Sequence, residues 1–505
     1  MRKVIVCLTL VMVLLLSSFT AVYARQPDKA YTYDGTEAVP STNAYQVKVI
    51  IDETVMGTTR LNSPTDIFVD KQNRTFILDA GNCRVLILDA NYKCIKELKE
   101  FTYTYKVEGE EGTKEEILTL AEDAKGLFYR DSNGYLYIAD TGNDRIIVTD
   151  LDGKVLRVHH KPVDELLDPD EPFKPQKIIV DNMGIMYVTS GRVNTGALLI
   201  DSANNFLGFY GINKIKATAE ILLEYFWRSI LTDAQNAQSG VTFQPVEFNN
   251  LFWSEDRFVY AVSPLNDSVE SAFVKLNALG KDVAPSKIDF SSYINSASLE
   301  AIGEMGLGVR TMRLVDVTVD DEGAISVIEQ TSGRIFQFDS NCNLLCVFGG
   351  KGYQKGSFTS PVSLESDTNN NLLLLDSGKN TITVMEQTFY GEMIREANRL
   401  FNEGRYEESV EPWQEVLRMN ANYTQAYVGM GKAYMSMGDY EQAMKYFELG
   451  DAKTEYSEAK ALLREGKIRD NFALIAAIVV ALMVGILGYD QIKKIFFTIY
   501  WRIRK

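Results

Sequence analysis

The chain has 505 residues, which predicts roughly three domains at about 150 residues each. Its net charge is −16, and this acidity argues against a nucleic-acid partner, because phosphate recognition needs a basic surface. With 46% hydrophobic and 24% charged residues, the chain can form large buried cores. Only two histidines are present, His159 and His160, which disfavours a His-rich zinc site or a Ser/His/Asp triad. We expect both to be solvated.

A secretory signal peptide is expected at residues 1–24. Two basic residues precede the apolar run Val4–Leu16, and small residues follow up to Ala24. A charged start, a short apolar core and a small-residue cleavage site are typical of such signals. An uncleaved anchor helix is the alternative. Residues 25–43 follow as a linker to the first folded domain.

An internal repeat occupies residues 61–388. In five blocks an aspartate stands nine positions before a second polar residue: Asp70 and Asp79, Asp131 and Asp140, Asp181 and Ser190, Asp320 and Glu329, Asp367 and Asp376. Aspartate in turns and at strand ends accepts hydrogen bonds from nearby backbone N–H groups. We therefore expect these repeated acids to be structural.

Each block predicts four short strands. In the second block the strand-like segments are Gly126–Asp131, Tyr135–Ala139, Ile146–Thr149 and Lys154–Val158, separated by turns. A repeated four-stranded unit is typical of a β-propeller blade. Counting a degenerate fourth block around Phe252–Asn277, the sequence predicts a six-bladed propeller over residues 44–388.

The pattern Asp-x-Gly-Asn-x-Arg occurs at Asp79–Arg84 and again at Asp140–Arg145. It resembles the signature of the NHL-repeat β-propellers, a family that includes both binding proteins and enzymes. The last block lacks a fourth strand because the chain turns helical after Thr388. We expect the orphan segment Tyr45–Ile51 to supply that strand and close the ring, which would remove exposed sheet edges.

Insertions are expected in the propeller near residues 101–123, 213–247 and 284–310. Within the second, apolar residues between Ile221 and Leu231 are spaced like one face of a helix. The insertions either pack on the propeller rim or shape a binding mouth.

After Thr388 the apolar spacing changes from that of strands to that of helices. Three residues recur 34 positions later: Gly404, Tyr406 and Trp413 return as Gly438, Tyr440 and Phe447. This pattern resembles the tetratricopeptide repeat (TPR), in which small residues let paired helices approach and aromatic residues fill the gaps. The resemblance implies two TPR repeats over residues 389–468, with the helix Tyr456–Ile468 as a cap.

A transmembrane helix is expected at residues 472–489. This stretch has no charged residue and is just long enough to cross a bilayer core. Residues 490–505 contain five basic residues and one acid, Asp490, so the positive-inside rule places this tail in the cytoplasm. We expect a single-pass protein of the cell membrane with most of the chain outside the cytoplasm.

No residue pattern predicts a catalytic, cofactor-binding or metal-binding site. The four cysteines that follow the signal, Cys83, Cys94, Cys342 and Cys346, lack metal-ligand spacing, and we expect free, mostly buried thiols. Gly350–Gly356 lacks the Gly-Lys-Ser/Thr ending of a phosphate-binding loop.

The sequence favours a membrane-tethered, extracytoplasmic binding or scaffold protein. Its propeller and TPR repeats would hold a protein partner near an envelope machine such as a transporter, and a small-molecule or carbohydrate ligand stays open. A lactonase-like hydrolase is the alternative that the NHL resemblance leaves. It would use calcium and need convergent Glu, Asp and Asn side chains at the channel mouth, so an apolar channel would exclude it. The second alternative is a ligand sensor that signals through a membrane partner.

Overall fold

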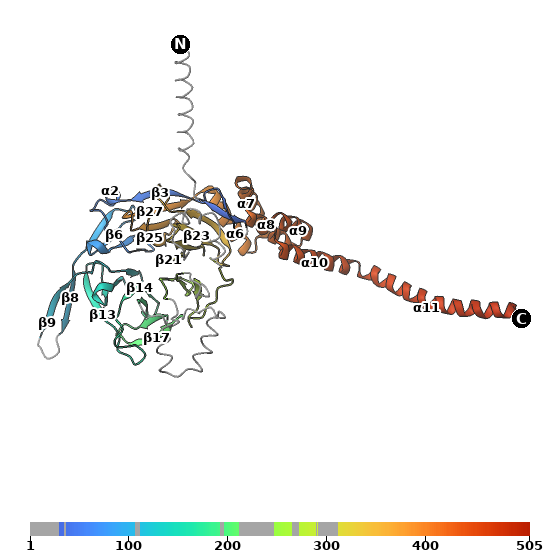
Figure 1. The fold of residues 1–505 in the computed structure, drawn as a ribbon, viewed down its shortest axis with the longest axis horizontal. Coiled ribbons are helices and arrows are strands. Elements are labelled where there is room, and N and C mark those ends of the chain that lie inside the picture. Colours follow the sequence, from blue (N-terminus) through green and yellow to red (C-terminus); the bar gives the residue numbers. More distant parts are fainter. Residues whose placement is uncertain are drawn as a thin grey trace, which may run out of the picture. The chain divides into compact units, whose positions relative to one another are not determined.

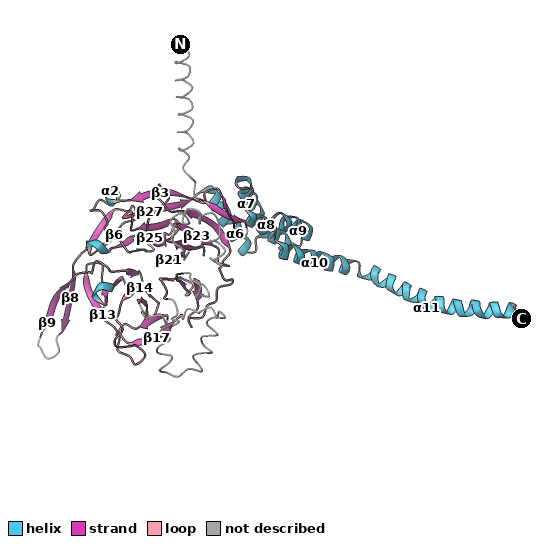
Figure 2. Cartoon of the chain, in the orientation of Figure 1, coloured by secondary structure: helices cyan, strands magenta, loops and turns pink. Residues whose placement is uncertain are grey.

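The computed structural model describes residues 30–34, 37–106, 112–191, 196–211, 247–264, 272–288, 290 and 312–504. The chain divides into two compact units, Met1–Glu392 and Met393–Lys505. Where it is described, the first unit consists mainly of strands and the second of helices (Figure 1, Figure 2).

Six antiparallel sheets form the six blades of a β-propeller. Blades 1 to 3 contain, from the innermost strand outward, β4 (Asp66–Val69), β5 (Thr75–Asp79), β6 (Arg84–Leu88) and β7 (Cys94–Leu98); β10 (Gly126–Arg130), β11 (Tyr135–Asp140), β12 (Arg145–Thr149) and β13 (Lys154–His159); and β14 (Pro175–Val180), β15 (Met186–Ser190), β16 (Ala197–Ile200) and β17 (Phe206–Tyr210). Blades 4 to 6 contain β18 (Asn250–Trp253), β19 (Val259–Val262) and β20 (Phe273–Leu276); β21 (Leu314–Val319), β22 (Ile325–Glu329), β23 (Arg334–Phe338) and β24 (Leu344–Gly349); and β25 (Pro361–Ser366), β26 (Leu372–Asp376), β27 (Thr381–Gln387) and β3 (Tyr45–Ile51). Short helices α2 (Glu53–Met56), η1 (Ala80–Asn82) and η2 (Thr141–Asn143) lie between strands.

The ring of blades is closed. Each innermost strand contacts the innermost strand of the next blade, and β25 contacts β4. The outermost strand of blade 6 comes from the start of the propeller, because β3 pairs with β27 in antiparallel register, with Val49 opposite Val384. The expected closure by Tyr45–Ile51 is confirmed. It pairs an edge of β27 that would otherwise present free backbone groups.

Two hairpins enlarge the blades. β8 (Phe101–Lys106) and β9 (Thr113–Leu118) extend blade 2 through parallel pairing of β8 with β13. β1 (Tyr31–Asp34) and β2 (Glu37–Pro40) extend blade 5 through β24. The segment 101–123, expected as an insertion, thus contains the first hairpin. The insertions expected near 213–247 and 284–310 lie largely outside the described residues.

The hydrophobic core of the propeller lies between neighbouring blades. Ile77 and Leu86 of blade 1, for example, pack in one cluster with Leu373 and Val384 of blade 6, and all four are fully buried. Successive residues of a strand point to opposite faces of its sheet, so each blade offers apolar side chains to both neighbours. Because each buried aliphatic side chain stabilises the fold by about 1.5–3 kcal/mol, these contacts hold the ring together.

The helical region contains α6 (Phe389–Asn402), α7 (Tyr406–Met419), α8 (Thr424–Ser436), α9 (Tyr440–Leu449) and α10 (Lys453–Asp470). Gly404 and Gly438, at equivalent repeat positions, have φ of 80° and 83°, the left-handed conformation that commonly ends a helix. Tyr406 and Tyr440 then begin α7 and α9. Helices α8 and α9 pack closely against each other, because a Cβ on Gly431 of α8 would lie 2.5 Å from the Phe447 ring of α9.

The last helix, α11 (Phe472–Ile503), is long and apolar. Its most apolar 18-residue window has a mean hydropathy of 2.6 and contains no buried residue. By length and composition the helix is able to cross a bilayer core. It continues without a break past residue 489, where the sequence pattern ended the expected span.

Candidate functional site

The first aspartate of each repeat holds the turn between the first two strands of a blade. In four blades its Oδ1 accepts hydrogen bonds from the backbone N–H groups two and four residues further on: Asp70, Asp181, Asp320 and Asp367. Asp131 differs because β10 contains one more residue before its turn. Arg130 of blade 2 occupies the position that Asp70 has in blade 1, but Arg130 still belongs to the strand and pairs with Tyr135. Asp131 therefore lies one residue further on and is exposed.

In blades 1, 2 and 6 the second aspartate of the repeat ties the blade to the loop that enters it. Asp79, Asp140 and Asp376 are fully buried, and an Oδ1 of each accepts a backbone N–H from that loop at 2.7–2.8 Å. These carboxylates satisfy backbone donors that would otherwise be buried without partners. Their bonds therefore join neighbouring segments of the scaffold.

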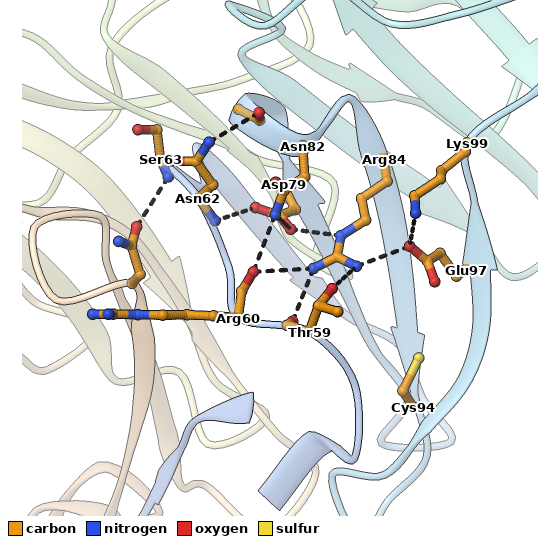
Figure 3. Close-up of polar contacts among 12 residues, drawn as sticks. Thr59, Arg60, Asn62, Ser63, Asp79, Asn82, Arg84, Cys94, Glu97 and Lys99 are labelled. Atoms are coloured by element: carbon orange, nitrogen blue, oxygen red, sulfur yellow. Dashed lines mark hydrogen bonds and ion pairs between the residues drawn. The ribbon is translucent and has the colours of Figure 1, made fainter. Parts of the chain in front are cut away.

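The Asp-x-Gly-Asn-x-Arg pattern forms one closed network (Figure 3). Asp79 Oδ2 accepts from Asn82 Nδ2 at 2.8 Å and from Arg84 Nε at 2.6 Å. The buried Arg84 guanidinium also donates to the Thr59 hydroxyl at 2.7 Å and to Glu97 at 2.8 Å. In the second blade Arg145 Nε donates to Asp140 at 2.8 Å in the same way. These hydrogen bonds stabilise the blade.

The channel is lined by a different set of residues, one from the innermost strand of each blade. These residues occupy the same register position in every blade, which we call the channel ring: Asp66, Gly126, Lys177, Asn250, Asp316 and Ser363. Five are polar and buried. In blade 2 only glycine fits, because a Cβ on Gly126 would lie 2.2 Å from the Gln176 carbonyl oxygen.

Hydrogen bonds between blades join the side chains of the channel ring, and one pair spans two blades. Lys177 Nζ lies 2.8 and 2.9 Å from the two carboxylate oxygens of Asp66, two blades away. The Ser363 hydroxyl lies 2.9 Å from Asp66 Oδ1 and 2.8 Å from Asp316 Oδ2, and Asn250 Nδ2 donates to Asp316 Oδ1. Asp66 also accepts the Leu127 N–H at 2.8 Å. The channel is therefore plugged by a polar network.

This network has more carboxyl groups than cations. Glu365, two residues after Ser363 on the same face of β25, adds a third carboxyl one layer along the channel. Burial, opposed by Lys177 and reinforced by Asp66, raises the pKa of Asp316 to about 6. Burial likewise raises the pKa of Glu365 well above its usual range, and Asp316 and Asp66 add to the effect. The channel thus retains protons that exposed carboxylates would lose.

A cavity of about 470 Å³ opens beyond Glu365, among the turns that the first aspartates hold. All six blades contribute to its lining. Its aromatic residues are Phe68, Phe128, Tyr129, Phe252, Trp253 and Tyr260. Its bases are Lys71, Arg130 and Lys275, and its acids are Asp70, Asp131, Glu255, Asp256, Asp320, Asp321, Glu365 and Asp367. We call this cavity the channel mouth; its aromatic residues come from blades 1, 2 and 4, and its acids outnumber its bases.

Calcium does not fit the channel ring. Calcium in proteins takes six to eight oxygen ligands around an open position. Here the ammonium group of Lys177 occupies the point toward which Asp66 turns both oxygens. Among the described residues, no group of three or more His, Cys, Asp or Glu is arranged to hold a metal ion. Carboxyl groups converge in the channel, but the ammonium group of Lys177 faces both oxygens of Asp66 in place of an open metal position.

The histidines and the described cysteines lie outside the channel ring and the channel mouth. His159 is 3% exposed, with Nδ1 3.3 Å from Asn204 Oδ1, so the expectation that both histidines are solvated is wrong for His159. It ends β13 and faces the third blade's turn, and burial lowers its pKa. The four cysteines are free; Cys342 and Cys346 are buried, whereas Cys83 and Cys94 are partly buried.

Comparison with protein families matches residues 424–450 to the tetratricopeptide repeat, a segment that covers α8 and α9. No curated protein sequence matches the chain. Similar solved structures include a virginiamycin B lyase from Staphylococcus aureus, with 10% identity, a TM-score of 0.39, and coverage of 68% of this chain and 100% of the other. A gluconolactonase from Xanthomonas campestris has 12% identity, a TM-score of 0.39, and coverage of 72% and 99%. The hydrazine synthase of Kuenenia stuttgartiensis has 12% identity, a TM-score of 0.37, and coverage of 65% and 97%. Likeness at this level carries no argument about function.

Proposed function

We propose that the chain is a membrane-tethered binding protein. Its propeller and TPR helices would hold a protein partner or a ligand outside the cytoplasm, near an envelope machine such as a transporter, and α11 would anchor them. The observation that carries the proposal is the exposure of α11, whose 18-residue apolar window contains no buried residue. An exposed apolar surface of that length is unstable in water, and a bilayer would cover it.

The distribution of charge supports the orientation. Lys493, Lys494, Arg502 and Arg504 follow the apolar window, with Asp490 as the single acid. Basic residues next to a transmembrane helix favour the cytoplasmic side. The propeller and the TPR helices would then lie on the opposite side, which fits the signal peptide expected at residues 1–24.

The TPR helices support a protein partner rather than an enzymatic role. Helical repeats of this class stack into extended surfaces that bind peptides or helices. The family match to residues 424–450 places this chain's α8 and α9 in such a repeat. The calcium-dependent hydrolase loses support because the ammonium group of Lys177 faces both oxygens of Asp66, where a metal ion would need an open position. A sensor that works through a membrane partner is compatible with the same binding role.

A matched pair of variants tests partner binding by the TPR helices. A Cβ on Gly431 would meet the Phe447 ring at 2.5 Å, whereas a Cβ on Gly466 of α10 has nothing within 4 Å. Gly431→Leu should therefore separate α8 from α9, and Gly466→Leu should leave the packing unchanged. The full chain is purified from detergent-solubilised membranes after crosslinking, and proteins that co-elute in stoichiometric amounts are identified.

The proposal predicts a partner that is retained by Gly466→Leu and lost with Gly431→Leu. A partner retained equally by both variants would place binding outside the TPR helices. A preparation without any stoichiometric partner would contradict the scaffold role.

A further inference from the structure

The channel mouth has the dimensions of a small-molecule site. Its volume of about 470 Å³ lies within the range of about 300–1,000 Å³ that is typical of ligand pockets. It lies among the turns between the first two strands of each blade, all of which belong to the described residues. Phe68 of blade 1 and Phe128 of blade 2 meet edge to face with ring centres 5.1 Å apart, and Phe252 and Trp253 of blade 4 also line the cavity. We call these four aromatic side chains the aromatic wall.

The sixth blade contributes a buried carboxyl group to the lining. Glu365 is 7% exposed and lines the cavity, and Thr318 provides a hydrogen bond. Within the described part of the chain, Glu365 forms no ion pair, because the nearest buried cation, Lys177, is bound to Asp66. A buried carboxyl without a cation is costly in its charged form, so it stays protonated until a cation approaches.

Two of the three bases at the mouth are paired with acids. The third, Arg130, donates from Nε to the Ser132 hydroxyl at 2.7 Å, and its Nη1 is buried without a partner among the described residues. Lys71 Nζ lies 2.7 Å from Glu255, and Lys275 Nζ lies 3.6 Å from Asp256. Lys275 also lies over the Phe258 ring, 4.3 Å from its centre. The protein thus places its own ammonium group against an aromatic face at this rim, an arrangement that stabilises a cation by about 0.5–2 kcal/mol. Carboxyl groups remain in excess, which favours a positively charged ligand and opposes an anionic one.

We propose that the channel mouth binds a small organic cation, an ammonium group attached to an apolar body, with Glu365 as the anchor of the charge and Phe68, Phe128, Phe252 and Trp253 as the wall for the body. This inference deepens the proposed function by naming a ligand class for the propeller. It concerns the propeller alone, so its failure would leave membrane attachment and partner binding by the TPR helices untouched.

Binding of a cation should release a proton. The charged groups that face Glu365 are Lys177 on β14, Asp316 on β21 and Asp66 on β4; Lys177 lowers its pKa and the two aspartates raise it. A bound cation adds a second positive neighbour, so the carboxyl proton of Glu365 passes to the solvent while the ligand keeps its charge. Affinity should then rise with pH until Glu365 is ionised in the free protein.

The test uses the purified, detergent-solubilised full chain and the probe benzyltrimethylammonium, whose charge does not depend on pH. Calorimetric titrations in phosphate and in Tris, which differ in ionisation enthalpy, measure both the affinity and the protons released. Benzyl alcohol provides the neutral comparison, benzoate the anionic one and glucose the sugar. We expect the cation to bind at least about tenfold more tightly than benzyl alcohol, a difference of about 1.4 kcal/mol, with release of part of one proton at pH 7.

Two variants locate the site. Glu365→Gln keeps the size of the side chain and should weaken the cation at least about tenfold and abolish proton release. Glu116→Gln, on the exposed strand β9 and outside the cavity, is the matched control and should bind as the parent does. If Glu365→Gln does not fold, Phe252→Leu tests the aromatic wall and should weaken the cation several-fold.

Three results would overturn the proposal. Equal affinity for benzyltrimethylammonium and benzyl alcohol would show that charge plays no part. Unchanged cation binding in Glu365→Gln would place the cation elsewhere. Binding of glucose without binding of the cation, or no binding of any probe to the folded chain, would show that the mouth does not recognise cations.

Discussion

The ion pair in the channel gives a prediction whose size follows from the structure. Lys177 and Asp66 have side chains that are 8% and 3% exposed, and they share two hydrogen bonds of 2.8 and 2.9 Å. Lys177→Met keeps the length of the side chain but removes its charge. Asp66 is then left buried without a cation, and loss of one partner of a buried pair destabilises a protein by about 3–5 kcal/mol.

Neutralising the second partner should restore most of that loss. In the double variant Lys177→Met/Asp66→Asn, the amide oxygen at position 66 still accepts the Leu127 N–H, which lies 2.8 Å from Asp66 in the parent. Without a buried charge, we expect the double variant to lie within about 1–2 kcal/mol of the parent. Adding Asp66→Asn to Lys177→Met should therefore recover about 1–4 kcal/mol of stability, whereas two independent substitutions would add their losses.

Pulse proteolysis in urea, applied to the full chain in detergent, measures these differences. Mass spectrometry of the cleaved fragments assigns each unfolding transition to the propeller or to the helices, so unfolding of the second unit does not interfere. The reasoning would be refuted if Lys177→Met alone cost less than about 1 kcal/mol. It would also be refuted if the double variant lost as much as the two single variants together.

The other predictions concern titration and helix packing. Because the folded state raises the pKa of Asp316 to about 6 from an ordinary 3.8, it holds the proton to higher pH than the unfolded chain does. This group should therefore make propeller stability fall as pH rises from about 4 to 6, by up to about 3 kcal/mol, and the slope should become shallower in Asp316→Asn, where only the contribution of Glu365 remains in the channel. His159 has the opposite sign: its pKa is lowered on folding, so its contribution is lost as pH falls below about 6.5, and His159→Gln should reduce that acid loss in the same urea assay. Gly431→Leu should lower the thermal midpoint of the helical unit by several degrees, as followed by circular dichroism at 222 nm, whereas Gly466→Leu should not change it.

The repeats made the architecture predictable from the sequence. Glycines, turn aspartates and apolar strands recur at fixed spacing because every blade packs against its neighbours in the same way. For that reason the sequence predicted the six blades, the closing strand Tyr45–Ile51 and the TPR helices. Asp131 was aligned with Asp70 because each stands nine residues before a second aspartate. The structure shows that the two are not equivalent, because β10 contains one more residue before its turn than β4 does.

The channel ring could not be predicted from the repeats. Its six positions hold five different residue types, because each blade contributes one part to a single shared network, and a network of unlike parts leaves no repeat. One signal was available: Lys177 interrupts the otherwise apolar end of β14, and a charge within a buried strand requires a partner. The partner itself, Asp66, is 111 residues away and becomes a neighbour only when the ring closes.

The histidine prediction failed for a related reason. His159 and His160 are adjacent and precede a lysine, which favours exposure when the sequence is considered alone. In a strand, successive side chains point to opposite sides, so one of two neighbours is buried when the strand packs against another blade. Burial of His159 beside Asn204 depends on contacts between blades that local sequence does not encode.

The central claim is that α11 tethers the propeller and the TPR helices outside the cytoplasm. Protease protection in intact cells tests it directly, with an epitope tag after Lys505 and antibodies against the propeller. The account predicts that the chain resists extraction by alkaline carbonate, that external protease degrades the propeller, and that the tag stays protected until the membrane is opened. Recovery of the chain in the soluble fraction, or digestion of the tag from outside, would contradict it.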